Sequence, residues 1–473
     1  MNAPAANLAD HPRTSLRVIL IAAAAALGGF LFGFDSAVIN GAVGALRHVF
    51  NLSAAVTGIA VACALLGSAL GAWYAGSLAD RFGRVRTMEV AALLLAAGGL
   101  GAGLAGSVAW FIALRVIAGI GIGVASVIAP AYIAEVSPAS IRGRLGSLQQ
   151  LAIVLGIFVA LASDAALANS AGGAEIALWF GLGAWRWMFL VGVIPAVIYG
   201  GLALTIPESP RHLVARGRID DARVVLRKVL SLHDAAALDR KIADIQNTLE
   251  REHKPRWGDL LGGRAGLLPV VWVGIILSIF QQFVGINVIF YYSTMLWHSV
   301  GFSESGSFSL TVITSIVNVV VTLVAIALID RIGRKALLVI GSSGMLVTLA
   351  AMAVCFAEAT GSGANVSLPG AWGPAALVAA NLYVVFFGVS WGPVVWVLLG
   401  EMFPNRIRAM ALAVAAAAQW LANFAITMTF PPMAQFSLVF SYGLYAFFAL
   451  LSLLFVLKFV RETRGVELED MPG

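Results

Sequence analysis

The chain of 473 residues is poor in charge: only 11% of its side chains are charged, whereas about 25% is usual for soluble proteins. Hydrophobic residues make up 60% of the sequence, and the mean hydropathy is +0.92. Water cannot cover that much apolar surface, so lipid must. The sequence also lacks the alternating segments of about ten residues that are typical of membrane β-barrels. Its apolar runs reach about 20 residues or more, which predicts an all-α membrane protein whose helices satisfy their own backbone hydrogen bonds.

Cysteine and histidine are scarce as well. The two cysteines, Cys63 and Cys355, lie in apolar runs and are expected to be small buried side chains rather than a disulfide or a metal-binding pair. The six histidines lie in tails, loops or the edges of apolar runs, and no His/Cys or carboxylate cluster stands out. The sequence therefore predicts no metal site, no cofactor and no enzyme activity. The first apolar run is too long for a signal peptide, so we expect it to be retained as a span.

Apolar runs long enough to cross about 30 Å of hydrocarbon form two sets of six, separated by a polar stretch. Within that stretch, Asp220 is placed to cap a helix over 221–232, and a second amphipathic helix is predicted over 235–250. The predicted units are a tail (1–16), a six-helix half (17–206), a helical insert (207–264), a second six-helix half (265–460) and a second tail (461–473). The predicted spans are 17–40, 54–78, 87–107, 109–133, 145–168 and 185–206, then 266–297, 307–330, 335–357, 374–400, 408–430 and 437–460.

Basic residues predict how the chain is oriented. All but three of the 30 lysine and arginine residues fall in the tails, the insert and the loops on the same side of this arrangement; the exceptions are Arg47, Arg115 and Arg186. Cytoplasmic segments carry such an excess, so both termini are expected in the cytoplasm. The bias also accounts for the net charge of +6 without any nucleic-acid partner.

The two halves repeat each other at matched positions. Asp80-Arg81-Phe82-Gly83-Arg84 follows the second span, and Asp330-Arg331-Ile332-Gly333-Arg334 follows the eighth. Glu135 follows the fourth span with Arg142 seven residues later, and Glu401 follows the tenth with Arg408 at the same spacing. Two matched pairs indicate a duplicated six-helix unit, an architecture in which the binding site lies at the midplane between the halves.

Over nearly its whole length the chain resembles the sugar porters of the major facilitator superfamily. The resemblance rests on the repeated loop motifs together with Pro207-Glu208-Ser209-Pro210-Arg211 and Gln281-Gln282-x-x-Gly285-Ile286-Asn287. The runs at 390–399 and 419–423 look most like those of the bacterial xylose–proton symporter and its glucose-transporting relatives. One departure is visible, because the family's C-terminal Pro-Glu-Thr-x-Gly stands here as Arg461-Glu462-Thr463-Arg464-Gly465. This leaves the local geometry of the tail open.

A sugar presents a ring of hydroxyl groups and one fairly apolar face, so its site needs amides, which donate and accept at once, and an aromatic platform. The alternative for amides inside a membrane is that they only join neighbouring helices, and for aromatics that they only pack. Gly285, Gly392 and Pro393 permit local unwinding, which alternating access would use. The resemblance implies sugar-binding roles for Gln150, Gln281, Gln282, Asn287, Asn318, Trp396, Gln419 and Trp420. Three further aromatics are expected to line the site or close it from outside: Phe32, Tyr291 and Tyr292.

The charged residues of the repeated motifs lie at the predicted cytoplasmic ends of helices. The resemblance implies that they pair across helices and hold the cytoplasmic side shut in the outward-facing state. The alternative is that they only anchor helix ends at the membrane surface. The residues concerned are Asp80 with Arg84, Glu135 with Arg142, Asp330 with Arg334, and Glu401 with Arg408.

Asp35 lies in the middle of the first predicted span. A charged aspartate at the bilayer centre costs about 2.5 kcal/mol or more, so it should face the interior and have a partner. The basic residue deep inside another span is Arg115, in the fourth. Burial favours neutral Asp35 and Arg115 favours the charged form, which leaves room for a switch. We predict that deprotonated Asp35 pairs with Arg115 and locks one conformation, and that protonation frees Arg115. A fixed structural ion pair is the alternative.

Together these features predict secondary active uptake of a neutral monosaccharide, glucose or xylose, by alternating access and with proton symport. A facilitative uniporter without proton coupling and a non-transporting sugar receptor are the alternatives. We expect a monomer that spans the bacterial inner membrane several times and whose ligands are a sugar and protons.

Overall fold

The computed structural model describes residues 12–137, 142–230, 234–251, 257–262, 266–360, 367–404 and 407–462 of the chain. Within these ranges, twelve helical segments are long and apolar enough to cross a membrane. Apart from three isolated β-bridges, the regular structure of the described residues is helical. The predicted all-α membrane fold with twelve spans is therefore confirmed.

The first six spans contain eight helices, because the first and the sixth spans are each broken once. The breaks fall at Val38 and Gly192, where the helix axis is interrupted for one residue. α3 packs along α5, and α1 packs along α6. The helices are α1 (Pro12–Ala37), α2 (Ile39–Val49), α3 (Ala54–Phe82), α4 (Arg84–Leu104), α5 (Val108–Val136), α6 (Arg142–Ala171), α7 (Ala184–Val191) and α8 (Val193–Ala203).

The last six spans also contain eight helices. The seventh span breaks at Gly285, as its glycine predicts: the residue takes a φ of +87°, and the Tyr445 ring lies 2.7 Å from where a Cβ would stand. The tenth span breaks at Val389 and Ser390, earlier than expected, and Pro393 lies in the first turn of the next helix, where its missing N–H is not needed. The helices are α12 (Pro269–Phe283), α13 (Ile286–Ser299), α14 (Glu304–Ile332), α15 (Arg334–Ala357), α16 (Trp372–Gly388), α17 (Trp391–Met402), α18 (Arg408–Phe436) and α19 (Leu438–Phe459).

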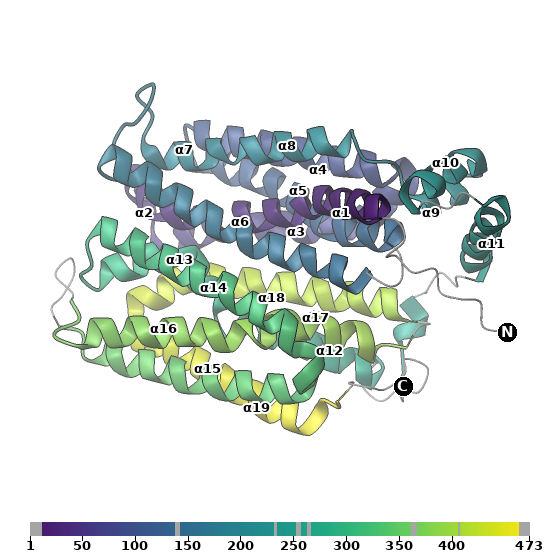
Figure 1. Ribbon diagram of the computed structural model, residues 1–473. Helices are drawn as coiled ribbons and strands as arrows, with labels where there is room; N and C mark the ends of the chain where they lie inside the picture. Colours follow the sequence, from purple (N-terminus) through teal and green to yellow (C-terminus); the bar gives the residue numbers. More distant parts are fainter. Residues whose placement is uncertain are drawn as a thin grey trace.

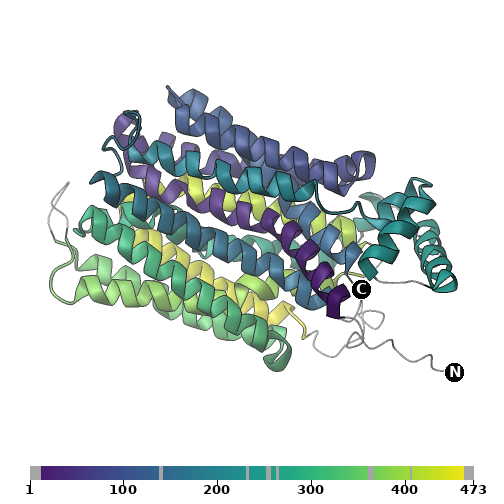
Figure 2. The same cartoon turned by 45° about the horizontal axis from the view of Figure 1, so that its top comes forward.

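The two sets of spans lie side by side along their whole length (Figure 1). α3 packs on α18 and α6 packs on α14, so each contact joins a helix of one set to a helix of the other. The small helices between the sets lie together at one end of the bundle, which a second view also shows (Figure 2). We name this end the insert side and the opposite end the far side.

The insert is helical, as predicted. It contains α9 (Pro210–Ala215), α10 (Ile219–Leu230) and α11 (Ala235–Arg251), and a short 3-10 turn, η2 (Trp257–Leu260), follows. The apolar faces of α10 and α11 are buried, with Leu226 and Ile242 almost fully covered. The predicted cap at Asp220 is wrong, because α10 begins one residue earlier, at Ile219. Asp220 and Asp221 lie in its first turn, where the helix dipole favours negative charge.

Candidate functional site

Asp35 and Arg115 form a buried ion pair within the first set of spans. Arg115 on α5 donates from Nη1 to Oδ2 of Asp35 over 2.7 Å and from Nη2 to the backbone carbonyl oxygen of Asp35 over 3.1 Å. That carbonyl is available because α1 ends at Ala37 and the last four carbonyls of a helix have no partner within it. The side chains are 2% exposed for Arg115 and 12% for Asp35. The structure thus brings together the two residues that the sequence singles out as partners.

Three glutamines and an asparagine form a continuous chain of amides around the break in the seventh span. Gln281 donates from Nε2 to the carbonyl oxygens of Trp391 (2.8 Å) and Gly392 (3.3 Å), and its Oε1 accepts from Gln419 of α18. Gln282 donates to the same Oε1 over 3.4 Å, and Asn287 donates to Oε1 of Gln282 over 2.5 Å. Because Gly285 turns the chain between α12 and α13, amides from both helices reach one place.

The amide chain has an unused end. Oε1 of Gln419 is buried and has no hydrogen-bond partner among the described residues. An amide that is held on one side and open on the other is suited to accept from a hydroxyl group. Next to it in the sequence, Trp420 packs its indole on Phe32 of α1, with the ring centroids 5.6 Å apart. This contact joins the two sets of spans beside the amides.

The other predicted sugar-binding residues are placed apart from the hydrogen-bonded chain. Gln150 on α6 is partly buried, and Asn318 on α14 is 8% exposed. Trp396 on α17 is 42% exposed. None of the three makes a side-chain hydrogen bond to the four amides among the described residues.

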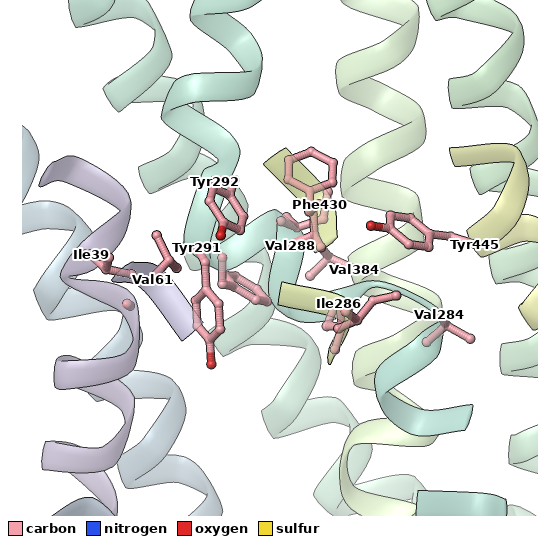
Figure 3. Packing of buried hydrophobic residues seen from close by; sticks show 14 of the residues in the cluster. Ile39, Val61, Val284, Ile286, Val288, Tyr291, Tyr292, Val384, Phe430 and Tyr445 are labelled. Atoms are coloured by element: carbon pink, nitrogen blue, oxygen red, sulfur yellow. The ribbon is translucent and has the colours of Figure 1, made fainter. Parts of the chain in front are cut away.

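The two tyrosines predicted near the site follow the break in the seventh span. Tyr291 and Tyr292 are both buried on α13 (Figure 3). Tyr291 reaches toward the first set of spans, beside Ile39 and Val61, and together with Ser36 and Arg115 it lines a small cavity. Tyr292 faces Phe430, with centroids 5.1 Å apart, and donates to the carbonyl oxygen of Thr427 over 2.9 Å. Tyr291 therefore connects the ion pair with α13.

Asn40 is a polar residue that the sequence reasoning missed. It is fully buried at the start of α2 and donates from Nδ2 to the carbonyl oxygen of Phe290 (2.9 Å) and to Oγ of Ser293 (2.8 Å). Its Oδ1 accepts from the backbone N–H (3.0 Å) and the hydroxyl (2.6 Å) of Thr294. These bonds join the two sets of spans on the far side of Asp35. An amide inside an apolar run is the sequence signal that could have found it.

The charged motif of the first half forms one cluster on the insert side. Arg84 donates to both carboxylate oxygens of Glu135, at 2.9 and 3.0 Å, and lies 3.3 Å from Asp80. Glu208 accepts from the backbone N–H groups of Arg84 and Val85 at the N-terminus of α4, where helix N–H groups lack partners. Gly83 makes room for it with a φ of +98°.

The second half repeats this arrangement. Arg334 donates to both oxygens of Glu401, at 2.8 and 3.1 Å, and Glu462 accepts from the backbone N–H groups of Arg334 (2.9 Å) and Lys335 (3.0 Å). The tail that departs from the family motif therefore still supplies its glutamate. Arg408 donates to the carbonyl oxygen of Phe403 over 3.1 Å. The side chains of Arg142 and Asp330 lie outside the described residues.

Comparisons with known proteins agree with this arrangement. Residues 21–473 match the family model described as "Sugar (and other) transporter". A glucose transport protein from Synechocystis sp. is 57% identical over 456 residues, which cover 96% of this chain and 97% of the relative. A D-xylose-proton symporter from Escherichia coli is 38% identical over an alignment of 487 residues, which covers 96% of this chain and 95% of the relative.

Solved structures of the xylose transporter from E. coli share the whole fold. Its inward-open conformation has a TM-score of 0.81, with 37% identity over 96% of this chain and 99% of that one. A partially occluded inward-open conformation reaches 0.82, and a complex with 6-bromo-6-deoxy-D-glucose reaches 0.78, each at 37% identity and covering at least 96% of both chains. The chain therefore belongs to the sugar transporter family of the major facilitator superfamily, and it is a multi-pass membrane transporter rather than an enzyme.

Proposed function

We propose that this chain takes up a neutral monosaccharide together with a proton, by alternating access between its two six-helix halves. The observation that carries the sugar is the amide chain of Gln281, Gln282, Asn287 and Gln419, whose open acceptor suits a hydroxyl group. Glucose is the first candidate and xylose the second, because similar proteins are named for glucose transport and for xylose–proton symport.

The conformation supports an inward-facing assignment. Asn40 holds α2 against α13 on the far side, and Gly58 of α3 packs directly on the backbone of α18 at Met428. These two contacts hold the halves together at that end. The similarity to inward-open structures of the xylose transporter agrees. In this assignment the sugar leaves toward the insert side.

Proton coupling is assigned to Asp35. A buried ion pair is expensive to break by removing one partner, at about 3–5 kcal/mol, because an uncompensated charge stays behind. A proton on Oδ2 of Asp35 weakens the pair without exposing a lone carboxylate. Arg115 then keeps its bond to the Asp35 carbonyl, and Tyr291 of α13 lines the same small cavity as Arg115. Protonation of Asp35 can therefore change the contacts that α13 makes in this cavity.

The remaining features complete the proposal. The insert side is cytoplasmic, in keeping with the distribution of lysine and arginine, and the membrane is the bacterial inner membrane. The Arg84–Glu135 and Arg334–Glu401 clusters each lie within one half and keep that half rigid while it rocks. The unit of transport is a monomer whose two halves are 17–206 and 265–460.

Transport by purified protein in proteoliposomes tests the function. Counterflow of labelled glucose, xylose and other neutral sugars identifies the substrate without a driving force, and an imposed pH gradient then tests coupling. We expect counterflow with glucose, and accumulation above the external concentration only when the outside is more acidic. Counterflow without pH-driven accumulation would establish a uniporter instead, and absence of counterflow with every sugar would refute sugar transport.

A further inference from the structure

A second aspartate is buried in the membrane and is not used by the proposed coupling mechanism. Asp164 lies on α6 and is 0% exposed. Neither carboxyl oxygen has a hydrogen-bond partner of acceptable geometry among the described residues. The carboxyl packs on Gly41: a Cβ there would lie 2.7 Å from Oδ2 of Asp164, and the peptide N–H of Gly41 is the polar group that faces it. Asp164 is thus in direct contact with the residue that follows Asn40.

No charged group in the described part of the chain compensates this carboxyl. The elements packed on α6 carry several such groups, and those whose side chains are described have other partners, are exposed, or lie toward the insert side. Asp35 of α1 is paired with Arg115 of α5, Arg186 of α7 donates to the carbonyl oxygens of Gly103 and Ala105, and Glu304 of α14 accepts from the N–H of Ala174. On α2, Arg47 and His48 are exposed, and His48 contacts Glu175. At the insert side, α5 carries Glu135, held by Arg84, and α14 carries Asp330 and Arg331.

An ionised carboxylate in such a place would cost several kcal/mol with nothing to offset it, so the group carries a proton instead. We propose that Asp164 is a second proton-binding site of this transporter, occupied while the far side is closed. The neutral carboxyl fits the apolar space between α6 and Gly41 without a counter-ion.

The position of Asp164 indicates the side of the membrane to which it would release its proton. α6 packs on α14, and α2 packs on α13, so both elements that enclose Asp164 also form the seam between the halves. When the halves part on the far side, the bonds of Asn40 to Ser293 and Thr294 break and water reaches Gly41 and Asp164. The O–H bond of the carboxyl then dissociates, and the proton passes to that water. Closing the seam requires the proton to return, so acid favours the closed far side.

Infrared spectroscopy of the purified protein in lipid tests for this proton directly. The Asp35→Asn variant removes the carboxyl assigned to proton coupling, so a carbonyl stretching band of a protonated carboxyl at neutral pH, shifted in heavy water, would report Asp164. We expect this band in Asp35→Asn and in Asp35→Asn/Ser163→Ala, a control on the neighbouring residue whose hydroxyl bonds only within α6. The band should be lost in Asp35→Asn/Asp164→Asn and in Asp35→Asn/Asp164→Ser, two variants of different size in case one does not fold.

The distance between the two halves on the far side tests whether protonation of Asp164 affects the conformation. Spin labels at Arg47 and Ser305, both exposed on the far side, report the separation of the halves once Cys63 and Cys355 are replaced by alanine. In Asp35→Asn, the closed fraction should rise as pH falls, and Asp164→Asn should abolish this response. A band or a pH response that survives removal of Asp164 would overturn the inference. The proposal rests on the proposed function only for the opening of the far side: if Asp35→Asn still accumulates sugar, coupling at Asp35 fails while the Asp164 band is unaffected.

Discussion

Arg115 holds Asp35 at two points, one on the carboxylate at 2.7 Å and one on the backbone carbonyl at 3.1 Å. Only the first contact depends on the charge of Asp35. A proton on the carboxyl therefore weakens the pair while the guanidinium stays attached to α1. The carboxylate contact can thus be switched by a proton, whereas the contact with the backbone carbonyl at the end of α1 stays in place.

Replacing Asp35 by asparagine should separate driving force from transport. The amide keeps an acceptor for Arg115 but cannot release a proton, so we expect pH-driven accumulation of sugar to be abolished while counterflow persists. Asp35→Ala should be worse for folding, by about 3–5 kcal/mol, because it leaves the buried charge of Arg115 without its carboxylate. Both activities are measured in proteoliposomes. Asp239→Asn, which removes an exposed carboxylate paired with Arg223, is the control and should behave as wild type. Accumulation by Asp35→Asn would end the coupling hypothesis.

Removing one amide of the hydrogen-bonded chain should weaken sugar binding without unfolding the protein. Gln419→Ala deletes the open acceptor and leaves Oε1 of Gln281 with one donor fewer. A net hydrogen bond is worth about 0.5–1.5 kcal/mol, so we expect the dissociation constant to rise about two- to tenfold for each bond lost. Titration calorimetry measures it. Asn381→Ala is the matched control, since that amide donates only to Leu377 within its own helix. An equal loss of affinity in both variants would argue against a site at Gln419.

Hydropathy predicted the twelve spans because burial in lipid leaves a chain few other solutions, and the repeated motifs predicted the duplicated halves. The Asp35–Arg115 pair was also foreseen, since an aspartate in a span needs a partner and Arg115 was the base placed deep in another. The break at Gly285 followed from the residue itself. These predictions share one physical basis: each follows from the free energy that it costs to place polar or charged groups in lipid.

Other features of the fold and of the site depend on contacts between side chains that lie far apart in the sequence, and a local sequence pattern does not specify such contacts. Val38 interrupts its helix without a proline or a positive φ, so the residues around it do not predict the break. Gly192 also lacks a positive φ, but Pro195 in the first turn of α8 is a local signal for the break there. Glu462 sits at the N-terminus of α15 although its motif departs from the family form. Asn40 and Asp164 are also polar groups in apolar runs, but the partners of Asn40 lie on α13, and the contact of Asp164 with Gly41 lies on α2, so no local pattern specifies either.

Loss of Asn40 should open the far side. Asn40→Ala leaves the N–H and hydroxyl of Thr294 and the hydroxyl of Ser293 without this partner, at about 1–3 kcal/mol for a buried unsatisfied group. Since 1.4 kcal/mol is a factor of ten, the closed-to-open ratio should fall about tenfold. The spin-label pair at 47 and 305 measures the populations. Thr429→Ala is the control, because its hydroxyl bonds only within α18. Unchanged distances in Asn40→Ala would show that the seam is held by apolar packing instead.

The docking of α9 should weaken in acid because of His212. Its Nδ1 lies 3.3 Å from Nη1 of Arg84, and since arginine can only donate, Nδ1 accepts and the ring is neutral. Burial lowers the pKa of His212 below its ordinary value; Glu208 opposes the shift, and Arg84 and Arg216 add to it. A lowered histidine pKa means that the docked state resists protonation. Its contribution to stability is thus complete above the ordinary value of about 6.5 and declines as pH falls below it, where the undocked ring takes up a proton first.

Hydrogen exchange of the α9 backbone measures this effect. We expect faster exchange, after correction for intrinsic rates, at about pH 5.5 than at about pH 7.5, values that bracket the ordinary histidine pKa. His212→Gln cannot titrate in this range but still offers an acceptor to Arg84, so its exchange should not depend on pH. His48→Gln removes an exposed histidine on the far side and should leave the response intact. If His212→Gln keeps the full response, the acid sensitivity of α9 arises from the neighbouring carboxylates, which lose charge at a lower pH.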